Sequence, residues 1–75
     1  SYLSTVFRKK TGVKFIDYLN DVRIEAAEAL LEKSDQKMSY IATSVGYDNV
    51  KYFFRIFKKR VGLTPEEYRQ RLRAE

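Results

Sequence analysis

Residues 41–57 read IATSVGYDNVKYFFRIF, and this stretch decides the fold. It predicts a short helix over 38–45, which ends at Gly46 because the turn there needs a positive φ. Asp48 or Asn49 can cap a second helix over about 50–60. The residues expected to face inward are Ile41, Ala42 and Val45 from the first helix, and Phe53, Ile56, Phe57 and Arg60 from the second.

The spacing of Ala42 and Gly46 indicates how these two helices are joined. Alanine lets the helices approach closely, and glycine lets the chain reverse within a few residues. This pattern is typical of a helix-turn-helix, whose second helix enters the major groove of DNA. Ordinary helical hairpins share the pattern, so the outward face of the second helix has to be considered as well.

That outward face is basic and carries one large aromatic side chain. A helical wheel groups Lys51, Arg55 and Lys58, with Phe54 beside them. Arginine can bond guanine O6 and N7 together, lysine can meet guanine or phosphate, and phenylalanine can pack on a thymine methyl group. The alternative is an ordinary solvated basic face, and the outward-facing Phe54 argues against it.

Upstream, a long helix is expected over about 14–34, followed by a break at 34–37. Its length of about 30 Å is close to the spacing of successive major grooves. The expected buried stripe consists of Phe15, Leu19, Val22, Ala26 and Leu30. Acidic residues fall on the opposite side and predict a solvated face directed away from DNA; they are Asp17, Asp21, Glu25, Glu28 and Glu32.

Downstream, Gly62 is expected to stop the second helix. Residues 64–67 read TPEE, which combines a threonine N-cap, a proline at the first helical position and a capping box. A last helix should therefore run to about Leu72. No useful length of the chain alternates with a period of two, so the predicted fold class is all-α.

The beginning of the chain repeats the second helix. Residues 1–12, SYLSTVFRKKTG, align with residues 51–62, KYFFRIFKKRVG. The repeat predicts that one helical unit is used twice, and that the chain begins inside the first copy. We therefore expect residues 1–35 to hold the recognition helix of a truncated first unit and the long linker helix. Residues 36–75 should hold the complete second helix-turn-helix with a C-terminal helix.

Composition excludes several classes of function. The 75 residues carry a net charge of +5 and contain neither cysteine nor histidine. The commonest general base and the thiolate metal ligands are therefore absent, and we predict no enzyme, no cofactor and no metal site. No apolar run approaches the length of about 18 residues that indicates a membrane span, and the absence of cysteine fits a cytoplasmic location. Clustered lysine and arginine favour a polyanionic partner, DNA above all.

The residues that carry the strongest resemblance lie in 40–69, where Y-I-A-x-x-V-G-Y is followed by Y-F-x-R-x-F-K-K-x-x-G-x-T-P-x-x-Y-R. This order resembles the C-terminal DNA-binding domain of AraC/XylS-type bacterial transcription regulators, and its style suggests their response-regulator branch. Residues 2–31 resemble the preceding part of that domain. The resemblance implies a homeodomain-like fold in which two helix-turn-helix units, joined by a long helix, each place one helix in the major groove.

The resemblance also implies which residues meet double-stranded DNA. Base contacts would come from Val50, Lys51, Phe54 and Arg55 in the second unit, and from Ser1, Ser4 and Thr5 in the first. Phosphate contacts would come from Asn49, Lys58, Lys59, Thr64, Glu66 and Arg8. RNA polymerase and a sensing or receiver domain outside this chain are the other implied partners.

Two departures from the family pattern concern Lys14, where a Ser or Thr cap is commoner, and Tyr40, where a polar residue is usual. The competing interpretation of the whole chain is a basic helical module that binds acidic protein or membrane surfaces without base preference.

Overall fold

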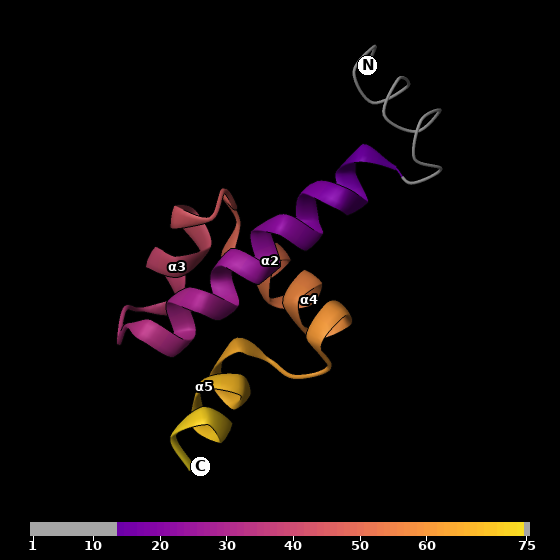
Figure 1. Ribbon diagram of the computed structural model, residues 1–75. Coiled ribbons are helices and arrows are strands. Elements are labelled where there is room, and N and C mark those ends of the chain that lie inside the picture. Colours follow the sequence, from indigo (N-terminus) through magenta and orange to yellow (C-terminus); the bar gives the residue numbers. More distant parts are fainter. Residues whose placement is uncertain (1–13, 75) are drawn as a thin grey trace.

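A computed structural model describes residues 14–74, and every regular element within them is a helix (Figure 1). The helices are α2 (Phe15–Lys33), α3 (Met38–Ser44), α4 (Val50–Val61) and α5 (Pro65–Ala74). The all-α prediction is confirmed, with helix bounds within two residues of those expected. The first-copy helix and its Gly12 stop lie outside the described residues.

The core forms where the C-terminal part of α2 meets α3, α4 and α5. Its buried apolar residues are Ile24, Ala27, Leu31, Ile41, Ala42, Tyr47, Phe53, Ile56 and Phe57. Aromatic rings line this core: the ring centroids of Phe53 and Phe57, both in α4, are 5.8 Å apart. Phe57 also meets Tyr68 of α5 edge-on, with 5.6 Å between ring centroids, and so connects α4 with α5. The predicted inward face of α4 is therefore confirmed, including Arg60, whose side chain is only 19% exposed.

The predicted buried stripe of α2 is wrong for Val22 and Ala26, whereas Phe15, Leu19 and Leu30 are partly buried. The residues that are buried are Asn20, Ile24, Ala27 and Leu31, whereas Val22 is 45% exposed and Ala26 is also exposed. Both sets of residues recur at helical spacing, so periodicity could not choose between them. The N-terminal end of α2 extends beyond α3 (Figure 1), whereas Asp17, Asn20 and Asp21 of its N-terminal half bond to α4.

The turn between α3 and α4 has the expected chemistry. Gly46 adopts a φ of 109°, and its N–H donates to the carbonyl of Thr43. Asn49, the second of the two predicted candidates, caps α4: its Oδ1 accepts from the N–H groups of Lys51 and Tyr52 at 2.9 and 3.1 Å. These local bonds fix where α4 begins.

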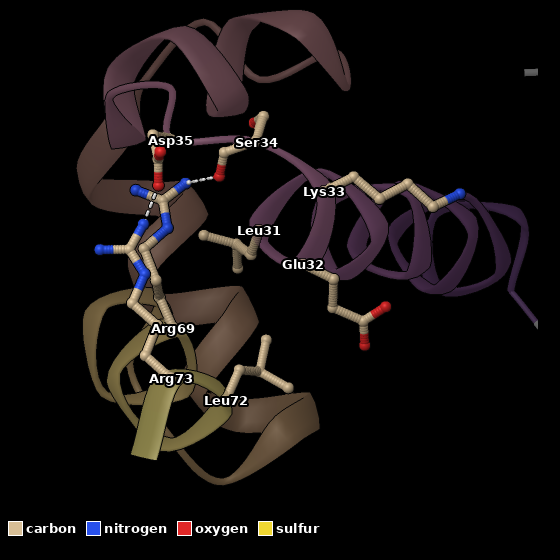
Figure 2. Close-up of a pocket in the computed structure, with 8 residues that line it drawn as sticks. All are labelled: Leu31, Glu32, Lys33, Ser34, Asp35, Arg69, Leu72 and Arg73. Atoms are coloured by element: carbon tan, nitrogen blue, oxygen red, sulfur yellow. Dashed lines mark hydrogen bonds and ion pairs between the residues drawn. The ribbon is translucent and has the colours of Figure 1, made fainter. Parts of the chain in front are cut away.

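Helix α5 is held at both ends. At its start the predicted capping box is confirmed, since the N–H of Thr64 donates to Glu67 Oε1 and the N–H of Glu67 donates to Thr64 Oγ1. Further along, Arg69 donates to the carbonyls of Ser34 and Gln36 at 3.1 and 2.9 Å. Figure 2 shows Arg69 and Arg73 reaching from α5 to the turn after α2, where Arg73 pairs with Asp35. The last helix is thereby tied to the α2–α3 connection.

The acidic residues of α2 are largely exposed, as expected, but three of them also bond to α4 and α5. Arg60 of α4 donates from Nε to Asp21 at 2.5 Å, and its Nη2 lies 3.8 Å from Asp17. Glu32 accepts a hydrogen bond from the hydroxyl of Tyr68. The acidic face thus adjoins the buried stripe and takes part in packing α4 and α5 onto α2.

Gly46 and Gly62 allow a matched test of the turn. Both have positive φ, but a Cβ at Gly46 would lie 2.8 Å from Arg23 Nε, whereas a Cβ at Gly62 would meet nothing within 4 Å. The Arg23 guanidinium carbon lies 5.5 Å from the Tyr47 ring centroid. A Cβ at position 46 would displace Arg23, and the contact between Arg23 and Tyr47 would be lost. Gly62→Ala should lower the free energy of unfolding by about 1–2 kcal/mol, and Gly46→Ala by about 0.5–1 kcal/mol more.

Urea unfolding of both variants, repeated with Arg23→Ala, measures the difference. In the Arg23→Ala background the two glycine substitutions should be equivalent. A difference that persists there would contradict the clash with Arg23.

Stability should fall at alkaline pH because of Tyr68. Burial, together with the hydrogen bond to Glu32, raises the pKa of Tyr68 from 10.0 to about 12. The neutral hydroxyl is favoured in the folded state, so this contribution is complete below pH 10 and is lost as the pH rises towards 12. Tyr68→Phe should flatten the pH dependence of the unfolding free energy in that window. Tyr40→Phe, at a side chain that is 56% exposed, is the control and should leave it as in the wild type.

Candidate nucleic-acid interface

One face of α4 combines cations with an exposed aromatic ring. Lys51, Arg55, Lys58 and Lys59 are exposed, and Phe54 is 38% exposed, while Val50 at the edge is partly buried. Phe53 and Phe57 occupy the opposite, buried side of the same helix. The structure therefore brings the predicted second-unit residues together at one surface, and their contact with DNA remains a prediction.

Two hollows mark this surface. A hollow of about 360 Å³ is lined by Asn49, Lys51, Tyr52 and Arg55 at the start of α4. A second, of about 150 Å³, is lined by Phe54, Thr64, Pro65 and Glu66. The second hollow places the start of α5 beside the outward face of α4, so that predicted base-contacting and phosphate-contacting residues share one surface.

The start of α5 offers fewer free donors than its sequence suggests. The N–H groups of Thr64 and Glu67 are engaged in the capping box, and proline at position 65 has none. The hydrogen bonds from Thr64, the backbone one first, lower the pKa of Glu67 and keep its carboxylate charged. Within the described part of the chain the N–H of Glu66 has no acceptor. Glu66 could therefore meet a phosphate only through its backbone, because its carboxylate would repel one.

The predicted phosphate contact of Asn49 is similarly restricted. Its Oδ1 accepts both capping bonds of α4, so only its Nδ2 group is available for an anion. Lys58 and Lys59 lie in the last turn of α4. Cations at that position also interact favourably with the helix dipole, a structural role that does not exclude phosphate binding.

Arg55 is held by a residue that sequence reasoning did not select. The Arg55 guanidinium carbon lies 5.3 Å from the centroid of the Tyr52 ring, one turn earlier in α4. Tyr52 also lines the hollow that contains Lys51 and Arg55. The spacing of three residues between Tyr52 and Arg55 is the signal that could have indicated this pair.

The remaining predicted contacts, from Ser1, Ser4, Thr5 and Arg8, lie outside the described residues. Across residues 14–74, no group of histidine, cysteine, aspartate or glutamate could hold a metal ion. The four described helices include none that is both long and apolar enough to cross a membrane.

The chain is similar in sequence to known transcription regulators. A family model described as a helix-turn-helix domain matches residues 1–71. The uncharacterized transcriptional regulatory protein YesN of Bacillus subtilis is 43% identical over 72 residues, which cover 93% of this chain and 20% of YesN. The HTH-type transcriptional activator RhaR of Yersinia pseudotuberculosis is 38% identical over 69 residues, covering 92% of this chain and 24% of RhaR. The chain thus spans less than a quarter of the length of either relative.

A solved structure shows the same fold. The C-terminal domain of the two-component response regulator yesN from Fusobacterium nucleatum superposes with a TM-score of 0.84 at 44% identity. The match covers 91% of this chain and 66% of that domain. The family model, the relatives and this structure agree with one another, and the chain belongs to the AraC/XylS-type helix-turn-helix family of transcription regulators.

Proposed function

We propose that this chain binds double-stranded DNA sequence-specifically as the DNA-binding domain of a cytoplasmic transcription regulator, with α4 in the major groove. The observation that carries the proposal is the exposed face of α4, where Lys51, Phe54 and Arg55 stand opposite the buried aromatic residues. Within residues 14–74 Arg55 makes no hydrogen bond or ion pair, so its donors are available to a base. Arginine that bonds guanine O6 and N7 is the commonest specific contact in the major groove.

Contacts around this face would set the position of α4 on the duplex. Asn49 at the start of α4 and Lys58 near its end lie on either side of the base-reading residues. The α5 start borders the hollow beside Phe54. Phosphate contacts of this kind fix register and orientation, and they carry little sequence information themselves.

The length of α2 supports tandem reading by two units. Its 19 residues span about 28 Å at a rise of about 1.5 Å per residue. Major-groove faces one turn apart are separated by about 34 Å. Residues 1–35 and 36–75 would then contribute to two DNA-binding units in the same orientation. The preferred DNA site would be an asymmetric direct repeat.

The acidic face of α2 supports a second partner, RNA polymerase. Asp21, Glu25 and Glu28 line a hollow of about 420 Å³ whose other walls include Ile24 and Val61. Arg60, which binds Asp21, projects from the inward side of α4. This acidic hollow therefore lies on the opposite side of α4 from Lys51 and Arg55, where it would face away from DNA and be accessible to a basic protein surface.

Two substitutions on α4 should separate base recognition from backbone binding. Arg55→Ala should weaken binding to the preferred site by about 1–3 kcal/mol and relax the preference at one base position. Lys58→Ala should weaken binding to all duplexes alike. It should also reduce the slope of log affinity against log salt concentration by about 1, the loss expected for one phosphate contact. Titration of the full-length protein against a selected and a scrambled duplex, over a range of salt concentrations, measures both effects.

The wild-type protein decides between the two interpretations of the basic face. Equal affinity for the selected and scrambled duplexes would reject sequence-specific binding. It would favour the basic module that binds acidic surfaces without base preference.

Charge reversal in the acidic hollow tests its orientation. The double substitution Glu25→Lys and Glu28→Lys should leave DNA affinity unchanged or higher, since added cations attract phosphate. Transcription from a dependent promoter should fall if the hollow contacts polymerase. A sharp loss of DNA affinity, measured in the same titration, would show that this face points towards the duplex.

A further inference from the structure

A polar network connects the buried side of α2 with the outward face of α4. Asn20 is only 3% exposed and lies in the stripe of α2 that packs against the other helices. Its Oδ1 accepts from the Tyr47 hydroxyl at 2.7 Å, and its Nδ2 donates to the Tyr52 hydroxyl at 3.4 Å. The two tyrosine rings are 5.8 Å apart and tilted at 57°. Both ends of the Asn20 amide are therefore used to hold tyrosines.

Tyr52 extends this network to the surface. Its hydroxyl lies at Asn20, while its ring lies 5.3 Å from the Arg55 guanidinium carbon. A buried side chain of α2 is thus joined, through one tyrosine, to the arginine at the centre of the proposed base-reading face.

Stacking on Tyr52 leaves Arg55 able to bind a base. A guanidinium that lies over an aromatic ring uses its face, whereas its N–H donors lie in its plane. No described residue takes those donors. Stacking also restricts a long side chain that would otherwise lose its rotamer freedom on binding DNA, and such preorganisation raises affinity and precision.

We propose that Tyr52 is a positioning residue for Arg55, and that Asn20, through the Tyr52 hydroxyl, holds that ring in place. The inference rests on the proposed function, because it assigns a base-reading role to Arg55. Tyr52 itself does not need to touch DNA. The base preference of the α4 face then depends on a buried side chain of the linker helix.

The experiment compares base preferences from a randomised duplex library, using the full-length protein. Arg55→Ala first identifies the base position that Arg55 reads. Tyr52→Leu removes the stacking ring and should reduce discrimination at that same position by about two- to fivefold, while other positions keep their preferences. Tyr52→Phe keeps the ring but releases it from Asn20, and should give a smaller loss at that position.

Tyr68→Leu is the matched control. Tyr68 is another partly buried tyrosine whose hydroxyl bonds to α2, through Glu32, but its ring packs on Phe57 and not on an arginine. This control should lower stability without changing any base preference. In the Arg55→Ala background, Tyr52→Leu should have no further effect on the preference profile.

The outcomes separate this inference from the proposed function. If the wild type selects no sequence, the proposed function fails and the inference fails with it. If the wild type is selective but Tyr52→Leu weakens all sequences uniformly, or sharpens the Arg55 position, the positioning role is overturned and the function stands. A Tyr52→Phe profile identical to the wild type would overturn the part assigned to Asn20, and this variant keeps the test decisive if Tyr52→Leu does not fold.

Discussion

The burial of Phe53 and Phe57 is the constraint on which the rest of the structure depends. Both side chains are fully enclosed, and they stand four residues apart on one side of α4. A helix anchored by two large rings cannot rotate without exposing one of them, which is expensive in lost burial. The direction of Lys51, Phe54 and Arg55 is therefore set by side chains that point the other way. The surface of α4 follows from its core.

Electrostatics divides the cations of α4 in a similar way. Arg60 lies on the inward side, where Asp17 and Asp21 neutralise it, and its charge helps to attach α4 to α2. The cations at Lys51, Arg55 and Lys58 have no ion-pair partner within the described structure. The net charge of +5 is thus not spread evenly: part of it is used internally, and the remainder on α4 collects on one face.

The turns and helix caps were predictable from the sequence, whereas the contacts between residues far apart in the chain were less so. Gly46, Asn49 and the 64–67 capping box each act on backbone groups within a few residues, so their effects could be predicted directly. The rotation of α2 could not, because two of its faces are apolar and the one that packs includes a polar residue, Asn20. The contact between Asn20 and Tyr52 joins residues 32 positions apart, and no local sequence pattern predicts it. The outward residues of α4 were placed correctly, whereas the tyrosine that supports one of them was missed.

The packing of α2 has a consequence for how the family domain can change over time. Its C-terminal part is fixed in the core through Ile24, Ala27 and Leu31, whereas its N-terminal end extends past α3 (Figure 1) and meets α4 through Asn20 and Asp21. Each residue of a helix turns the direction of the next side chain by about 100° around the helix axis. Inserting or deleting one residue before Asn20 would turn everything N-terminal to it by that angle relative to α4. Substitutions at its exposed positions, such as Ile16 and Val22, leave this rotation intact, so these positions tolerate changes of sequence far better than the helix tolerates changes of length.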